Sequence, residues 1–488
     1  MNASQELVGR LRAIIAQDQD VISDPALLRT FECDGLAHYR VTPMVVVLPT
    51  TVTQVSAIVA TCHEMNVPFV ARGNGTGLSA GALPVGNGVL IVLSKFRRIH
   101  EIDRANLRAV VDPGVINLDV SKRSFPAGLY YAPDPSGQQI CSIGGNIAEN
   151  SGGAHCLKYG FTTHHVTGIE VVMPDGRIAN FGGFKSVDSP GYDLLGAFIG
   201  SEGTLGIATK IVVRLLRKPE LVKTLLAAFN STSEAGEAVS AIIASGILPA
   251  AIEMMDALAI EAAEKTVQCG YPTGANTVLI VELDGPDFDV STGIGRVQNI
   301  CETYGATEVR IAQTESERAL IWKGRKSAFA AIGTISPDFI IQDGVIPRTV
   351  LPVVLSEIAK LAAESGIRVA NVFHAGDGNL HPLVLFDESV EGELERANEV
   401  SGAIIDLCIK YGGSITGEHG VGADKVSYMG KMFNEYDLDT MQLVRCAFDQ
   451  ENLCNPGKVF PTPRLCGEIP GIHRGLHPLV EQGLAELF

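Results

Sequence analysis

The sequence of 488 residues is too long for one hydrophobic core, so two or more domains are expected. Its 46% hydrophobic content and 52 glycines exclude a fibrous or disordered chain. A net charge of −17 disfavours nucleic-acid binding, because phosphates are held mainly by Lys and Arg. An anionic substrate would therefore need a local basic pocket.

The N-terminal residues 1–16 are predicted to form an amphipathic helix, with Leu7, Leu11, Ile14 and Ile15 on its apolar side. They lack the apolar run and cleavage site of a signal peptide, and no apolar stretch long enough to span a membrane follows. The ten cysteines include no CxxC pair, which argues against a cysteine-held zinc or iron–sulfur cluster. We therefore expect a cytoplasmic protein, and peripheral attachment to the inner face of the cell membrane through partner subunits stays compatible with the sequence.

Short β-rich runs alternate with helices and glycine clusters over residues 43–217, which predicts an α+β nucleotide-binding domain after an N-terminal segment, 1–42. Strands are expected at 44–48, 68–71, 89–93, 109–111, 168–173 and 207–215. A helix over 53–65 would be capped by Thr51 or Thr53. A second unit, 218–434, should hold helices at 233–246, 255–269, 351–365 and 391–411, and strands at 277–283 and 367–373. The remaining segment, 435–488, is too short to fold alone.

Three glycine-rich segments occupy residues 72–81, 142–153 and 200–207 of the first domain. Four glycines in the first let backbone N–H groups approach an anion such as a pyrophosphate. No Gly-Lys-Ser/Thr follows, so this is not a Walker loop. Three such segments suit an extended ligand with a diphosphate and a flat ring; the alternative is three tight turns.

His374 and His381 flank Asp377-Gly378, a dipeptide typical of a β-hairpin turn. Two antiparallel strands joined by this turn would place the two imidazoles opposite each other as cross-strand partners. The rings would then be close enough to share a metal ion. Glu418, in the glycine-rich segment 412–422, would complete a site with open positions that suits zinc, manganese or iron. The alternative is a glycine-rich loop carrying a surface Glu-His pair.

The family resemblance given below implies oxidation of an alcohol, which needs a base that takes the hydroxyl proton as hydride leaves the carbon. His419, beside Glu418, is the predicted base, and a metal on the hydroxyl would lower its pKa. A substrate carboxylate needs a cation, and Arg325, in the basic cluster 322–326, is the predicted clamp. Such a cluster can equally be a solvated helix face.

The order of these segments resembles the vanillyl-alcohol oxidase, or PCMH-type, flavoprotein family, and residues 31–458 resemble the flavin-subunit family of bacterial glycolate oxidases. Related families are the D-lactate and D-2-hydroxyglutarate dehydrogenases. The resemblance implies an α+β fold: a two-part PCMH-type FAD-binding domain, a substrate domain of the FAD-linked oxidase C-terminal type, and a C-terminal segment that packs on the FAD domain. Thr76 stands where members with covalent flavin carry a histidine, which implies non-covalent FAD.

The resemblance also implies residue roles: metal ligation by His374, His381 and Glu418, proton abstraction by His419, and hydride transfer to flavin N5. A Trp-x-x-Arg motif of the family fits Trp322 and Arg325 and supports the clamp. The residues expected to bind FAD are Arg72, Gly73, Asn74, Gly75, Thr76, Gly77, Asp134, Pro135, Ser136, Ser142, Gly144, Gly145, Asn146, Asn150, Gly152, Gly153, Glu202, Gly203, Gly206, Ile207 and Asn455.

The substrate is expected to be a small 2-hydroxy acid. Where D-2-hydroxyglutarate dehydrogenases carry a lysine and an asparagine for a second carboxylate, this sequence has Ile341 and Leu383, which favours glycolate or D-lactate. A larger D-2-hydroxy acid is the alternative, a metal-dependent hydrolase is a distant one, and a pure binding subunit would lack the metal residues. The resemblance implies that electrons pass to partner subunits, one with iron–sulfur clusters, and then to membrane quinone. A diffusible acceptor is equally compatible.

Overall fold

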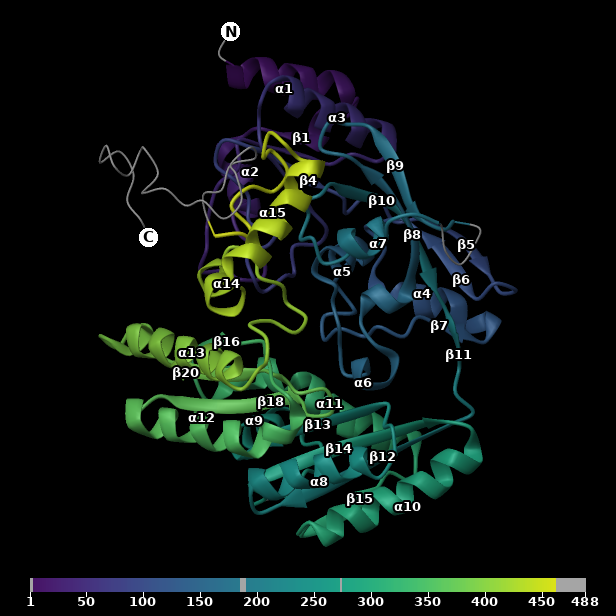
Figure 1. Cartoon of the computed structure of the whole chain (residues 1–488), viewed down its shortest axis with the longest axis vertical. Coiled ribbons are helices and arrows are strands. Elements are labelled where there is room, and N and C mark those ends of the chain that lie inside the picture. The colour runs from purple at the N-terminus through teal and green to yellow at the C-terminus, as the bar shows by residue number, and fades with distance from the viewer. Residues whose placement is uncertain (1–2, 185–189, 273, 462–488) are drawn as a thin grey trace.

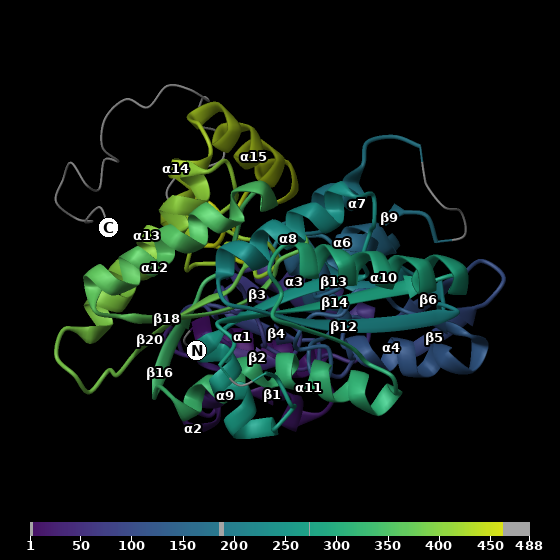
Figure 2. The same cartoon turned by 90° about the horizontal axis from the view of Figure 1, so that it is seen from below.

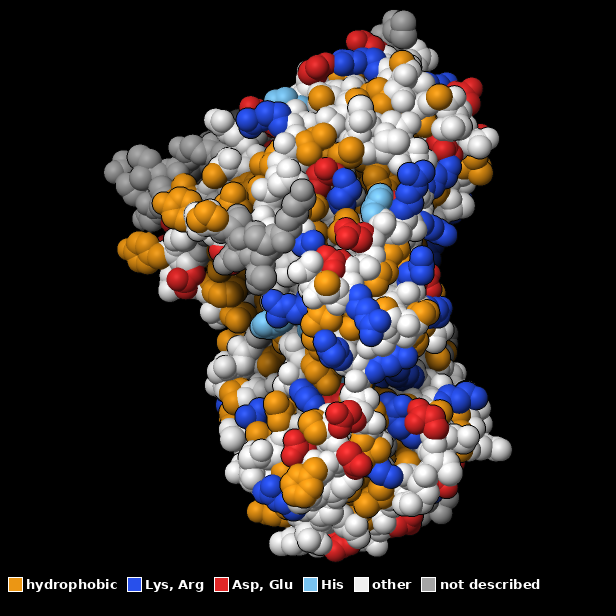
Figure 3. Space-filling model, turned by 90° about the vertical axis from the view of Figure 1, so that its right-hand side faces the viewer, with side chains coloured by type: hydrophobic (Ala, Val, Ile, Leu, Met, Phe, Trp, Pro, Cys, Tyr) orange, Lys and Arg blue, Asp and Glu red, His pale blue; other side chains and the backbone are white. Residues whose placement is uncertain are grey.

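The computed structural model describes residues 3–184, 190–272 and 274–461. The chain forms two α+β halves stacked along the long axis of the molecule, one holding the N-terminal region and the last helices, the other holding the middle of the chain (Figure 1). Although the chain carries −17 overall, Lys and Arg side chains gather near mid-height on one face (Figure 3). No helix among the described residues is long and apolar enough to cross a membrane.

The first half contains a four-stranded sheet in the order β1-β2-β4-β3. The strands are β1 (Val21–Ile22), β2 (Val45–Val47), β3 (Phe69–Arg72) and β4 (Val89–Val92). The helices α1 (Ala3–Ile14) and α3 (Val52–Glu64) pack their apolar sides on one face of it, and α2 (Pro25–Leu28) packs on the other. Of the two residues predicted to cap α3, Thr51 forms the cap: its hydroxyl accepts the Gln54 N–H in a capping box.

A five-stranded antiparallel sheet, β5-β6-β10-β8-β9, completes the first half. Its core includes Ile143 and Ile147 of α5, so the second glycine-rich segment is packed against this sheet. A short ladder joins β7 to β11. The bounds are β5 (Ile99–Asp103), β6 (Arg108–Val111), β7 (Leu129–Tyr130), β8 (Val166–Val172), β9 (Ile178–Gly182), β10 (Ile207–Arg214), β11 (Leu216–Arg217), α4 (Asn117–Ser124), α5 (Ile143–Glu149), α6 (Cys156–Tyr159) and α7 (Leu194–Phe198).

The second half is built on a large antiparallel sheet, β15-β12-β14-β13-β18-β19-β17, to which β20 and β16 add beside β18. Helices α8, α10, α12 and α13 cover one face, and α9 and α11 cover the other (Figure 2). The bounds are β12 (Leu221–Phe229), β13 (Ala251–Asp256), β14 (Thr277–Gly285), β15 (Glu308–Ile311), β16 (Asp338–Ile341), β17 (Gly344–Val345), β18 (Arg368–His374), β19 (Asn379–Leu380), β20 (Pro382–Phe386), α8 (Thr232–Ala244), α9 (Ala257–Val267), α10 (Asp287–Thr303), α11 (Glu315–Ala331), α12 (Leu351–Ser365) and α13 (Glu393–Lys410).

The chain then returns to the first half through α14 (Val426–Met432) and α15 (Glu435–Phe448). Beyond α15, Cys454 forms a parallel bridge with Phe69 of β3, and the Asn455 N–H donates to the Phe69 carbonyl at 2.8 Å. The predicted α+β class and the return of the C-terminal segment are therefore confirmed, up to residue 461. The rest of the predicted segment, 462–488, lies outside the described residues.

Two local predictions need correction. The helix expected over 255–269 begins at Ala257, because Met255 belongs to β13 and the Asp256 carboxylate accepts the Ala259 N–H to cap α9. His374 and His381 are not direct cross-strand partners: His374 pairs with Asn379 in the ladder, so His381 lies diagonally, two residues further on the same face. The glycine turn still brings the two rings together.

Candidate active site

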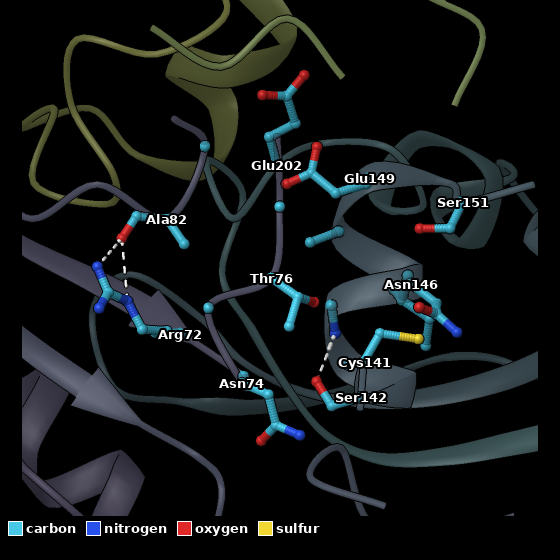
Figure 4. A pocket seen from close by; sticks show the side chains of 18 of the residues that line it. Arg72, Asn74, Thr76, Ala82, Cys141, Ser142, Asn146, Glu149, Ser151 and Glu202 are labelled. Carbon is cyan, nitrogen blue, oxygen red and sulfur yellow. Dashed lines mark hydrogen bonds between the residues drawn. The ribbon is translucent and has the colours of Figure 1, made fainter. Parts of the chain in front are cut away.

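A cavity of about 350 Å³ lies between the two halves and is lined by residues from both. The first half contributes the three glycine-rich segments, some of whose side chains are shown in Figure 4. The second half contributes Phe329, Ile341, His381, Glu418 and His419. Segments far apart in the sequence thus share one concave site, which is the usual setting of a cofactor and its substrate.

The first glycine segment leaves β3 at Arg72 and wraps the cavity. The Arg72 guanidinium does not project into it but braces the loop, donating to the Ala82 carbonyl at 2.7 Å and 3.2 Å (Figure 4). Gly73 allows close approach to the next segment, since a Cβ there would lie 2.1 Å from the Ser142 hydroxyl. Gly73, Gly75 and Gly77 line this part of the cavity without side chains, so an anion can approach the loop backbone closely there.

The second segment begins α5, whose N-cap is Ser142, with its hydroxyl accepting the Gly145 N–H at 3.3 Å. The buried Asn146 amide nitrogen and Ser201 hydroxyl on the cavity wall have no hydrogen-bond partner within the described part of the chain. Buried polar groups are normally paired, so these atoms indicate a polar ligand in the cavity.

Most residues predicted to bind FAD line this cavity, and five do not: Asp134, Asn150, Gly152, Gly153 and Asn455. These five brace its walls. The Asp134 carboxylate contacts the ring nitrogen of His155 at 2.8 Å, Asn150 accepts the Thr163 N–H, and Asn455 donates to the carbonyls of Gly81 and Glu202. Gly153 packs on Asp134, and a Cβ on Gly152 would lie 2.9 Å from Glu418 Oε2.

The three predicted metal ligands form one buried cluster. Glu418 Oε1 lies 3.4 Å from Nε2 of His374 and 3.4 Å from Nε2 of His381, and the two imidazole rings are 5.1 Å apart. Nε2 of both histidines and Oε2 of Glu418 have no hydrogen-bond partner among the residues that the structure describes. The donor set and its unpaired buried atoms fit a divalent cation such as zinc.

Two acidic residues that the sequence reasoning missed hold this cluster. Glu253 of β13, which is fully buried, lies with Oε1 2.7 Å from Nδ1 of His374. Asp343, also fully buried, accepts the backbone N–H groups of Gly417 and His419 at 2.9 Å and lies 3.4 Å from Nε2 of His381. A carboxylate on the ring nitrogen that does not ligate, as Glu253 is on Nδ1 of His374, fixes the orientation of a ligating imidazole. Asp343 instead faces the same Nε2 of His381 as Glu418 does, and it holds the backbone of the segment that carries Glu418.

Charges within the cluster oppose the effect of burial. Burial lowers the pKa of His374, but the Glu253 carboxylate outweighs it, so the pKa lies well above its usual value. Burial raises the pKa of Glu418, yet His374 and the other histidines bring it down to about 2. Glu418 is therefore ionised at neutral pH and able to bind a cation.

His419, the predicted base, lies at the cavity wall with its ring stacked on that of His381 at 5.1 Å. Its Nδ1 is 4.0 Å from Asp343 Oδ2, too far for a hydrogen bond. Burial lowers the pKa of His419 to about 4, so in this environment the ring is neutral at physiological pH. A neutral imidazole on the wall of a cavity is able to accept a proton.

Arg325, the predicted clamp, is buried on α11 behind the cavity rather than on its wall. Its Nε donates to Oε2 of Glu253 at 2.7 Å, so Glu253 bridges Arg325 and His374. Its guanidinium lies 5.6 Å from the ring centre of Phe329, which does line the cavity. Trp322 of the same motif donates to Glu282 and takes no part in the wall.

Comparison with known proteins identifies both halves. Residues 43–182 match the FAD binding domain family, and residues 218–459 match the C-terminal domain of FAD linked oxidases. The chain is 51% identical to the glycolate oxidase subunit GlcD of Escherichia coli (strain K12), over 94% of this chain and 91% of that one. It is 32% identical to a D-lactate dehydrogenase of Anaerostipes hadrus, over 88% of this chain and 92% of that one. Substrate-bound p-cresol methylhydroxylase has the same PCMH-type fold, with a TM-score of 0.78 at 17% identity, over 94% of this chain and 97% of that one.

Proposed function

Since the chain belongs to the FAD-linked oxidase family that includes the glycolate oxidase subunit GlcD, it is an FAD-dependent oxidoreductase, and we propose that it oxidises glycolate to the 2-oxo acid. D-lactate is the second candidate, because D-lactate dehydrogenases are among the relatives. One observation carries the proposal: His381, Glu418 and His419 line the same cavity as the glycine-rich segments. Hydroxyl activation and hydride acceptance then share one site.

Non-covalent FAD occupies the part of this cavity walled by the glycine-rich segments. Thr76 stands where covalent flavoproteins of the family carry histidine, so a histidine–flavin bond cannot form at this position. The unpaired amide of Asn146 and the exposed backbone of residues 73–77 suit the polar parts of the cofactor.

His374, His381 and Glu418 hold a divalent metal, with zinc as the first candidate and manganese or iron as alternatives. The support is chemical: two imidazole nitrogens and a carboxylate oxygen, all buried, lie within 4.8 Å of one another. Without a cation, their unpaired atoms would remain an uncompensated cost in a dry site.

Bound FAD supplies the hydride acceptor, and the metal supplies a Lewis acid for the hydroxyl. His419 takes the hydroxyl proton while the hydride leaves the same carbon, so the C–O single bond becomes a double bond and two electrons leave the substrate. Asp343, which accepts the His419 backbone N–H, keeps the ring beside the cavity. Phe329 and Ile341 keep water from that end of the cavity.

Arg325 remains the proposed cation for the substrate carboxylate. It is the guanidinium directly behind the Phe329 wall, and Glu253 neutralises it before substrate binds. An approach of the carboxylate to Arg325 therefore requires movement of the Phe329 side chain.

A small substrate is favoured by the wall around Ile341. Ile341 pairs with Leu383 across β16 and β20, so the two positions that suggested a small substrate lie together. Ile341 lines the cavity and Leu383 is fully buried behind it. A second carboxylate would lose its hydration there without gaining a partner, which disfavours D-2-hydroxyglutarate. The same flavin-type cavity weighs against a hydrolase.

Partner subunits are part of the proposal, because the relative from Escherichia coli is itself named as a subunit. We expect electrons to leave through a partner carrying iron–sulfur clusters, with peripheral attachment to the cytoplasmic face of a membrane through that partner. The basic side chains gathered at mid-height in Figure 3 offer one face for an acidic partner surface.

Anaerobic mixing of the purified flavoprotein with 2-hydroxy acids tests the substrate. Glycolate and, more slowly, D-lactate should bleach the oxidised flavin spectrum, while L-lactate and D-2-hydroxyglutarate should leave it nearly unchanged. A flavin that stays oxidised with both glycolate and D-lactate would overturn the assignment. Protein purified with no flavin and unable to take up FAD would overturn the cofactor.

A further inference from the structure

The segment 417–422, which carries Glu418 and His419, is held from both halves of the molecule by two buried carboxylates. Asp343, from the second half, accepts the N–H groups of Gly417 and His419. Glu202, from the first half, accepts the N–H groups of Val421 and Gly422, each at 2.6 Å. Glu202 is 5% exposed, and its carboxylate is turned toward this segment rather than toward the glycine loop of residues 72–77.

The backbone of Glu202 is itself fixed. Its N–H donates to the Ala148 carbonyl at 2.8 Å, and its carbonyl accepts from the Asn455 amide at 2.6 Å. Its φ of +51° is a left-handed conformation, which residues other than glycine seldom adopt. These constraints aim the side chain across the gap between the halves, so Glu202 is rigid enough to position what it binds.

A second carboxyl, that of Glu149, lies against the same segment without bonding to it. A Cβ on Gly420 would stand 2.1 Å from Glu149 Oε2 and 2.9 Å from Glu202 Oε1, so both carboxyls close on the bare backbone of Gly420. Within residues 3–184, 190–272 and 274–461, Glu149 Oε2 has no hydrogen-bond partner. Burial raises the pKa of Glu202 to about 7 and that of Glu149 well above its usual value, so the two do not both ionise near neutral pH. Glu202 holds the two N–H bonds, and Glu149 does not.

We propose that Glu202 is a positioning residue: by accepting the Val421 and Gly422 N–H groups, it sets the segment that carries Glu418 and His419 at the correct place opposite the FAD-binding half. The inference rests on the proposed metal and base roles of those two residues. Glu202 itself need not touch substrate or metal, because its effect passes through the backbone of residues 418–422.

The Glu202→Gln variant keeps the shape of the side chain and one good acceptor while it removes the charge. Glu149→Gln is the matched control, because it changes the neighbouring carboxyl that makes no bond to the segment. Amide hydrogen exchange of the FAD-loaded, metal-free protein should quicken about tenfold in peptides covering 418–425 for Glu202→Gln, and stay at the wild-type rate for Glu149→Gln. Equal rates in wild type and Glu202→Gln would overturn the proposal, as would equal acceleration in both variants.

Zinc binding separates positioning from simple loss of fold. Zinc titrated into chelator-stripped holoenzyme should bind Glu202→Gln about 10- to 100-fold more weakly than wild type, as found for residues that orient metal ligands. The FAD-to-protein ratio should match wild type. Unchanged zinc affinity overturns the proposal, and lost FAD would assign Glu202 to the cofactor instead. If wild type itself binds no zinc, the proposed metal site fails while the exchange experiment still decides the role of Glu202. A milder effect in Glu202→Gln than in Glu202→Ala is also expected.

Discussion

Nδ1 of His374 lies 2.7 Å from Oε1 of Glu253, which leaves Nε2 of the same ring directed at Glu418, 3.4 Å away. Glu253 thereby selects the ring nitrogen that is free to bind a metal. Its other oxygen is bound by the Nε of Arg325. One buried carboxylate thus connects the metal cluster to the predicted carboxylate clamp.

Replacing Glu253 by glutamine should weaken zinc affinity about 10- to 100-fold, because the His374 ring loses its charged orienting partner. Stability should fall by about 3 kcal/mol, since Arg325 is left as a buried unpaired charge. Zinc titration and urea unfolding measure the two effects. Asp256→Asn is the control on the same strand, because Asp256 is outside the cluster and asparagine still caps α9. It should cost about 1 kcal/mol through its weaker bonds to Asn371 and leave zinc affinity intact. Equal zinc affinities in both variants would contradict this role.

Truncation of a ligand should deplete the metal. His374→Ala protein is expected to retain FAD but to lose at least about tenfold in zinc affinity, measured as metal per flavin after dialysis. His165→Ala is a fitting control, because His165 is equally buried but bonds only the Tyr159 carbonyl. Unchanged metal content in His374→Ala would show that the ligands are misassigned. Chelation of wild type should likewise stop flavin reduction, and added zinc should restore it.

His419→Gln should slow anaerobic flavin reduction by glycolate about 10²- to 10⁴-fold, the usual contribution of a general base. The FAD content and zinc affinity should stay near those of wild type, because the His419 backbone N–H still donates to Asp343. Stopped-flow absorbance of the flavin gives the rate. His100→Gln is the control, because His100 is exposed on β5 and does not line the cavity. Its flavin should be reduced at the wild-type rate. Fast reduction in His419→Gln would mean that another group takes the proton.

The sequence predicted most elements, because hydrophobic periodicity reports directly on which face a helix or strand buries. The helix α12 begins and ends where expected, and the histidine pair across Gly378 does converge. The sequence did not predict a role for Glu253, because β13 is short and the residues around Glu253 are apolar. The end of β13 was also assigned to the following helix. A charged residue alone in such an apolar run was the available signal.

Contacts between distant segments were beyond the reach of local patterns. Glu202 was assigned to the cofactor because it lies in a glycine-rich segment, but its carboxylate bonds residues more than 200 positions later. The partners of Asp343 are similarly remote in sequence, at 416–419. Such pairings depend on tertiary packing, between the halves for Glu202 and within the second half for Asp343, which neither periodicity nor turn composition encodes.

A buried histidine at the contact between the halves should make stability fall at alkaline pH. Burial lowers the pKa of His155, but the carboxylates of Asp134 and Glu282 outweigh it and raise the pKa to about 10. The protonated form is therefore favoured by folding. This contribution is complete below pH about 6.5, the unfolded value, and is lost as pH rises through 10, on the order of 2–4 kcal/mol in total.

Urea unfolding of wild type and His155→Gln at pH 6.5, 8 and 10 isolates the contribution of His155 to the free energy of unfolding from that of other titrating groups. Wild type should be clearly more stable at pH 6.5, and the difference should shrink toward pH 10. A difference that is constant across the range would show that His155 is not charged in the folded protein.

Ile341→Lys should shift specificity toward substrates with a second carboxylate. Ile341 lines the cavity, so a lysine there would give a distal carboxylate a charged partner in an apolar wall. We expect kcat/KM for D-2-hydroxyglutarate to rise about tenfold and that for glycolate to fall, measured by anaerobic flavin reduction.

Ile340→Lys is the matched control, because Ile340 packs into the core on the opposite face of β16. It should destabilise the protein without changing the substrate preference. Identical preferences in the two variants would mean that Ile341 does not face the substrate.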